Sequence, residues 1–73
     1  MKLSKRELQK IRAALPTGSM TEISSRSGLG ISTVKGSLFY PERFNAVVIE
    51  TALCLIKEQK ERVESLKNLI KGI

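Results

Sequence analysis

The side chains best suited to chemistry lie between residues 31 and 43, and their chemistry is hydrogen bonding and charge rather than bond making. Ser32 and Thr33 can donate to or accept from the edges of several bases. Ile31 can contact a thymine methyl group, and Lys35 can reach a phosphate or a guanine. The residues that we expect to contact nucleic acid are Ser19, Thr21, Ile31, Ser32, Thr33, Lys35, Gly36, Ser37, Tyr40 and Arg43.

Two members of this set have alternatives that the sequence leaves open. Tyr40 is as well suited to packing in the core as to holding a phosphate, because tyrosine is often half-buried. Gly36 falls inside an expected helix, where glycine costs roughly 1 kcal/mol relative to alanine. It either permits close approach to a sugar-phosphate chain or is merely tolerated.

Catalytic and metal chemistry have little support. The chain has no histidine, which removes the usual proton shuttle near neutral pH and the common zinc-ligand sets. The single cysteine, Cys54, lies in an apolar stretch and is expected to be a buried, unreactive thiol. Most carboxylates are interspersed with lysines late in the chain and are expected to be solvated. We therefore expect no enzyme activity, no metal, no cofactor and no small-molecule ligand.

The elements that must position residues 31–43 follow from apolar spacing. Ile23 faces inward on one short helix, and Val34 and Leu38 form the inner stripe of the next. Gly28 supplies the backbone freedom for the turn between them, and Leu29 fills the angle. Residues 20–39 are thus predicted to form a helix-turn-helix, with helices at 20–27 and 31–39, and the exposed face of the second helix is suited to the major groove of DNA.

Capping signals place the remaining helix ends. Ser4 and Glu7 have the spacing of a capping box, so a first helix begins after Ser4 and ends before Pro16. Ser19 and Glu22 repeat the capping-box pattern before the second helix. Asn45 caps a long helix over roughly 46–71. The chain is therefore predicted to be all-α, a small four-helix domain in which residues 1–44 form a three-helix bundle and residues 45–73 the long helix.

The long helix exceeds what a domain of this size needs, and its apolar residues recur at alternating steps of three and four. This heptad pattern predicts a dimerisation seam beyond the helix's contact with its own bundle. The alternative is an amphipathic helix that folds back on its own domain, and like charges at Lys60, Arg62 and Lys67 do not favour pairing. The predicted seam consists of Ile49, Ala52, Ile56, Gln59, Val63, Leu66 and Ile70, extending to Ile73.

Composition limits the class of protein. Seventy-three residues make one domain with a marginal core, so stabilisation by a second copy is expected. The net charge is +6, and the N-terminal 15 residues are its most basic part. A basic face serves either for solubility or for attraction to phosphate, and the adjacent groove-reading motif favours the second. Without a long apolar run, the chain is expected to be cytoplasmic and to have no membrane partner.

Residues 19–56 resemble the DNA-binding headpiece of the LacI-type repressors and the related lambda-repressor-like domains. The matching positions are Ile23, Gly28, Leu29, Thr33, Val34 and Leu38, followed by a fourth helix that starts near Asn45. The resemblance implies a bundle whose third helix reads the major groove, usually as a dimer. Ser24 and Gly30 depart from the alanine and the capping serine that the family favours, and the base-reading positions Ile31, Ser32 and Gly36 are smaller or less polar than usual.

These observations predict a small DNA-binding transcription regulator of prokaryotic or phage type, in which a homodimer places the 31–39 helix of each subunit in a major groove of double-stranded DNA. No ligand-binding domain is expected beside the headpiece, which indicates a free-standing regulator. The alternative is a protein-interaction module that keeps the helix-turn-helix scaffold without base readout. The low polarity of the 31–39 helix favours this alternative, whereas the basic charge favours DNA.

Overall fold

A computed structural model describes residues 3–73, which fold into four α-helices and one short 3-10 helix, with no strand in this range. The elements are α1 (Lys5–Ala14), α2 (Ser19–Ser27), α3 (Ile31–Phe39), η1 (Pro41–Arg43) and α4 (Ala46–Lys71). The predicted all-α class is confirmed, and α3 and α4 have the predicted bounds. No helix within residues 3–73 is both long and apolar enough to cross a membrane.

Helix ends follow local capping chemistry in α1 and α4. The Ser4 hydroxyl accepts from the Glu7 amide at 3.2 Å, and the Glu7 carboxylate accepts from the Ser4 amide at 3.0 Å, which completes the predicted capping box. These hydrogen bonds also hold the pKa of Glu7 below its usual range. At α4, the Asn45 side chain accepts from the amides of Val47 and Val48. Both caps hold donors that a helix start otherwise leaves free.

The predicted capping box at the start of α2 is wrong. Ser19 is already helical, and the residue before it, Gly18, has a left-handed backbone with φ of 81°. The Ser19 hydroxyl is buried and donates to the carbonyl of Pro16 instead of capping the helix. The turn at Gly18 therefore starts the helix in place of the serine side chain that the sequence pattern indicated.

One hydrophobic core joins all four helices. Its largest fully buried side chains come from every helix, with Leu8 on α1, Ile23 on α2, Val34 and Leu38 on α3, and Val48 on α4. Partly buried apolar side chains complete it, namely Ile11, Leu15, Met20, Leu29 and Phe44. The apolar positions that predicted the α2–turn–α3 unit are the ones that the structure buries.

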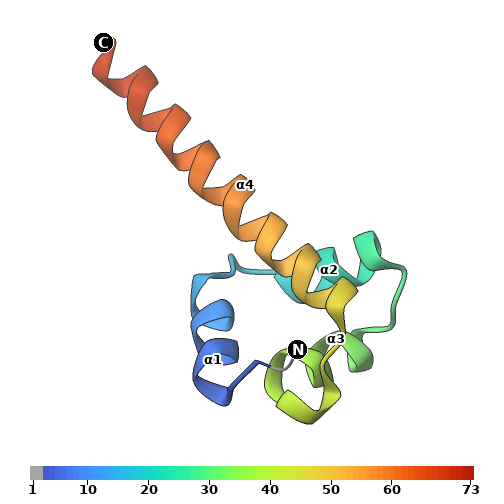
Figure 1. The fold of residues 1–73 in the computed structure, drawn as a ribbon. Coiled ribbons are helices and arrows are strands. Elements are labelled where there is room, and N and C mark those ends of the chain that lie inside the picture. The colour runs from blue at the N-terminus through green and yellow to red at the C-terminus, as the bar shows by residue number, and fades with distance from the viewer. Residues whose placement is uncertain (1–2) are drawn as a thin grey trace.

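The long helix α4 projects far beyond this core as a straight rod that carries the C-terminus away from the other helices (Figure 1). The described chain accordingly measures 48 × 25 × 18 Å along its principal axes. An ion pair ties the rod to the body, since the Arg26 guanidinium donates to both oxygens of Glu58 at 2.6 and 2.9 Å and to Glu22 at 2.8 Å. Every residue from 60 to 73 is exposed.

Two expectations about α4 require correction. Ile49 and Ala52 are buried in the core of their own chain, so they are not available to a dimer seam. They face inward because the first half of α4 packs on α2 and α3. Cys54, expected to be buried, is exposed because it lies on the side of α4 that faces away from the body.

Candidate nucleic-acid interface

The turn between α2 and α3 is fixed by backbone geometry and by two serines. Gly28 ends α2 in the left-handed conformation that the sequence predicted, with φ of 74°. The Ser24 hydroxyl donates to the Leu29 carbonyl at 2.6 Å, and the Ser27 hydroxyl accepts from the Leu29 amide at 3.3 Å. Ser24, which departs from the alanine of the resembled family, thus cross-links the turn and sets the angle of α3.

The first turn of α3 projects into solvent. Ile31, Ser32 and Thr33 are exposed, and Lys35 is exposed one turn along. Ile31 keeps 47% of its surface accessible although it is a large apolar residue. The inner residues Val34 and Leu38 are completely buried, so the exposed side chains are held on a firmly anchored helix. This is a surface on which four predicted contact residues lie together.

Arg43 and Tyr40 extend this surface beyond the end of α3. The Arg43 guanidinium lies 5.6 Å from the centre of the Tyr40 ring, within the range of a cation–π contact. Tyr40 is 52% exposed, so the core-packing alternative for this residue is wrong. Ser32, Lys35, Gly36, Phe39, Tyr40 and Arg43 line one shallow depression, which joins the outer face of α3 to η1.

Gly36 is explained by this depression. A β-carbon at Gly36 would lie 3.0 Å from the Arg43 Cδ atom and 3.4 Å from its Nη1 atom. The glycine is buried because the arginine side chain lies across it. Gly36 therefore permits the close approach of the Arg43 side chain, which packs against the helix at this position and does not extend freely from η1.

Two predicted contact residues do not belong to the exposed surface. Ser37 is 1% exposed, and its hydroxyl accepts from the Asn45 amide at 3.1 Å, so it joins α3 to the start of α4. Ser19 is 7% exposed, and its hydroxyl is committed to Pro16. Both were predicted to contact nucleic acid. The prediction of a direct contact is wrong for both, because their side chains are buried away from solvent. Thr21 is exposed on the first turn of α2 and stays a candidate.

Arg12 is a positioning residue that the sequence did not single out as such. Its Nη1 atom donates to the Leu38 carbonyl at 2.6 Å, and its guanidinium lies 4.3 Å from the centre of the Phe39 ring. The arginine thus binds the C-terminal end of α3 to α1, where cations are favoured by the helix dipole. Of the basic residues of α1, Lys5, Arg6 and Lys10 are exposed, whereas Arg12 is half-buried.

The helices of the α2–turn–α3 unit begin differently from the other two. Gly18 precedes α2 and Gly30 precedes α3, and neither helix start has a side-chain cap. The first amides of such helices lack a side-chain acceptor, and this arrangement suits an anion such as phosphate. In α1 and α4 the equivalent amides are held by Ser4 and Asn45.

Within residues 3–73, no cluster of acidic residues, cysteine or histidine has the arrangement to hold a metal ion. Comparisons of the chain with protein-family models, curated proteins and solved structures gave no match.

Proposed function

We propose that the chain is a double-stranded DNA-binding regulator that inserts α3 into the major groove and acts as a homodimer. The single observation that carries the proposal is the exposed first turn of α3, with Ile31, Ser32 and Thr33 in solvent above a completely buried inner stripe. Short polar and apolar side chains at the N-terminal end of a rigidly held helix match the way such helices contact base edges. The prokaryotic or phage setting, and action in the cytoplasm, are part of this proposal.

Positive charge around α3 supports the same function. Lys35 and Arg43 flank the outer face of α3, and the chain as a whole carries +6. The uncapped starts of α2 and α3 add backbone amides that can bind phosphate oxygens. Phosphate contacts of this kind position a protein on duplex DNA, while the side chains of the first α3 turn would read the bases.

Binding to duplex DNA at two salt concentrations tests the proposal. A randomised duplex pool, labelled for fluorescence anisotropy, is titrated with protein at 50 and 200 mM salt, and bound sequences are recovered to find a preferred site. We expect binding at 50 mM that weakens steeply at 200 mM because phosphate contacts release counterions. Absence of binding at 50 mM by folded protein would overturn the proposal and favour a protein-interaction module.

A matched pair of variants locates the DNA surface. The double variant K35A/R43A removes two charges beside α3, and R62A/K71A removes the same charge from the outer half of α4, away from both α1 and α3. We expect K35A/R43A to weaken binding and to lower the salt slope by about one for each phosphate that the protein no longer neutralises. The control should bind nearly as well as the unmodified chain. An equal loss of affinity in both variants would mean that net charge, and not the α3 surface, determines binding.

A further inference from the structure

Two of the three aromatic residues of the chain are adjacent and exposed at the end of α3. Phe39 keeps 45% and Tyr40 52% of its surface accessible, whereas Phe44 packs against the core and is partly buried. Large aromatic side chains are usually buried, because their size makes burial strongly stabilising. Neither Phe39 nor Tyr40 belongs to the hydrophobic core of the chain, so both rings are available to a ligand.

The depression on the outer face of α3 brings these two rings together with two cations. Lys35 and Arg43 line it beside Phe39 and Tyr40, and its volume of about 430 Å³ lies within the roughly 300–1,000 Å³ of sites that hold one small ligand. The Arg12 guanidinium lies 4.3 Å from the centre of the Phe39 ring but is not part of the lining, so it supports this ring from the side of α1. Aromatic rings and positive charge are therefore presented at one place.

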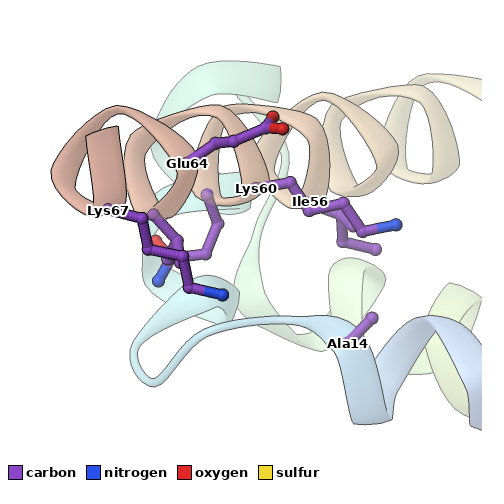
Figure 2. A pocket seen from close by; sticks show the side chains of 7 residues that line it. Ala14, Ile56, Lys60, Glu64 and Lys67 are labelled. Carbon is purple, nitrogen blue, oxygen red and sulfur yellow. The ribbon is translucent and has the colours of Figure 1, made fainter. Parts of the chain in front are cut away.

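The charge of this depression differs from that of three other hollows of the molecule. The hollow between α1 and the outer half of α4 carries Glu64 beside Lys60 and Lys67 (Figure 2). Two further hollows, at the start of α2 and beside the start of α4, also include glutamate side chains. Among residues 3–73, no carboxylate lines the depression beside α3, and the neighbouring Glu42 is exposed outside its lining. An anionic ligand in this depression therefore meets cations without an opposing carboxylate in the wall.

A nucleotide with an unpaired base combines the two properties that this lining suits. Its phosphate is an anion for Lys35 and Arg43, and its base is a planar π system that stacks on aromatic rings and on guanidinium planes. Inside a duplex each base is stacked between its neighbours, so only an unpaired or extruded nucleotide offers its face to a ring on a protein surface. The aromatic part of the depression therefore suits a single strand and not a closed duplex.

We infer that the depression beside α3 binds an unpaired nucleotide of single-stranded DNA, with the base stacked on Tyr40 and the adjoining phosphate held by Lys35 and Arg43. Gly36 contributes by letting Arg43 lie close to α3, where its guanidinium is 5.6 Å from the centre of the Tyr40 ring. Phe39 adds a second aromatic wall. This activity is additional to the proposed binding of a duplex and does not require a dimer. Because every base has a π face, binding should tolerate different sequences.

The fluorescence of Tyr40 tests this inference in the unmodified chain. The chain has one tyrosine and no tryptophan, so its ultraviolet emission reports on residue 40 alone. The probe is a thymidine strand of about ten nucleotides, and an abasic strand of equal length supplies the same phosphates without bases. After correction for absorption by the bases, we expect the thymidine strand to quench the emission and the abasic strand to leave it nearly unchanged. Binding of the thymidine strand without quenching would contradict stacking on this ring.

Substitution of the ring separates stacking from charge. By fluorescence anisotropy at low salt, the unmodified chain should bind the thymidine strand at least about five-fold more tightly than the abasic strand, the lower end of what one base–aromatic stack contributes. Y40A should lose most of this difference, and Y40F should keep it because the ring remains. The matched control is L53A, which removes an exposed apolar side chain outside the depression and should also keep the difference. Circular dichroism checks that each variant is folded.

The two proposals fail in different ways. Equal affinity for the thymidine and abasic strands, or an unchanged ratio of the two affinities in folded Y40A, would overturn the inference. Duplex binding together with equal affinity for both strands would overturn the inference alone. A base-dependent affinity for the single strand, without any binding to a duplex, would instead overturn only the proposed function.

Discussion

The Cδ atom of Arg43 lies 3.0 Å from the place that a β-carbon would take at residue 36, so Gly36 and Arg43 occupy one site together. This relationship joins the outer face of α3 to η1. It also assigns Gly36 a role in placing a cation, where the sequence left a choice between close approach and mere tolerance.

The substitution G36A separates helix stability from the placement of Arg43. Alanine favours the helix by up to about 1 kcal/mol, while the new methyl group displaces the arginine. We expect the free energy of unfolding in urea to stay within about 1 kcal/mol of the parent or to rise, and DNA affinity to fall several-fold. In an R43A background, G36A should have little further effect on affinity. A full effect there would show that the methyl group obstructs DNA directly.

Substitutions of Ser37 and Ser32 should have opposite effects, the first on stability and the second on DNA affinity. Removing the buried Ser37 hydroxyl leaves the Asn45 amide without its acceptor, so S37A should cost about 1–3 kcal/mol in urea unfolding. The exposed Ser32 has no such partner role, so S32A should change stability by no more than about 0.5 kcal/mol and instead lower DNA affinity. A stable S37A with weakened DNA binding would restore Ser37 to the contact surface.

Substitutions at the two ends of the predicted seam should differ in how their effect on stability depends on protein concentration. I49A opens a cavity in the core and should cost about 2–5 kcal/mol at any protein concentration. I70A removes an exposed side chain and should lower apparent stability only at concentrations where the dimer forms. Urea unfolding at several protein concentrations measures both. A concentration-independent loss of stability in I70A would contradict a role between chains.

Acid should loosen the attachment of α4 to α2. The hydrogen bonds from Arg26 hold the pKa of Glu58 below its ordinary value, so this pair stabilises the fold above about pH 4.3. Its contribution is lost as the pH falls through the lowered pKa of the folded state, where the carboxylate takes up a proton. E58Q should therefore lower Tm at pH 7 and lose that difference towards pH 3. E61Q, elsewhere on α4, is the control, and an equal Tm drop in E61Q would contradict the assignment.

Local signals in the sequence predicted the helices well because capping and turn chemistry act over a few residues. Pro16, Gly28 and Asn45 each limit a helix by their own backbone or side-chain chemistry, and α3 and α4 begin and end where expected. The Ser19 pattern failed because a nearby glycine, Gly18, turned the chain first.

Burial was harder to predict because it depends on residues far along the chain. Ser37 is covered by the start of α4, and Arg26 finds Glu58 across 32 positions of sequence. The apolar residues of α4 recur with heptad spacing, but this periodicity does not state which of them the chain's own core covers. Ile49 and Ala52 are among those that it covers.

The rod that leaves the core has a consequence for how the protein would respond to its own abundance. Residues 60–71 continue α4 as a helix beyond the core, and all of them are exposed in one chain. Pairing would cover apolar side chains of this segment and double the number of α3 surfaces in one step. The occupancy of a DNA site with two half-sites would then rise more steeply than the concentration of the protein.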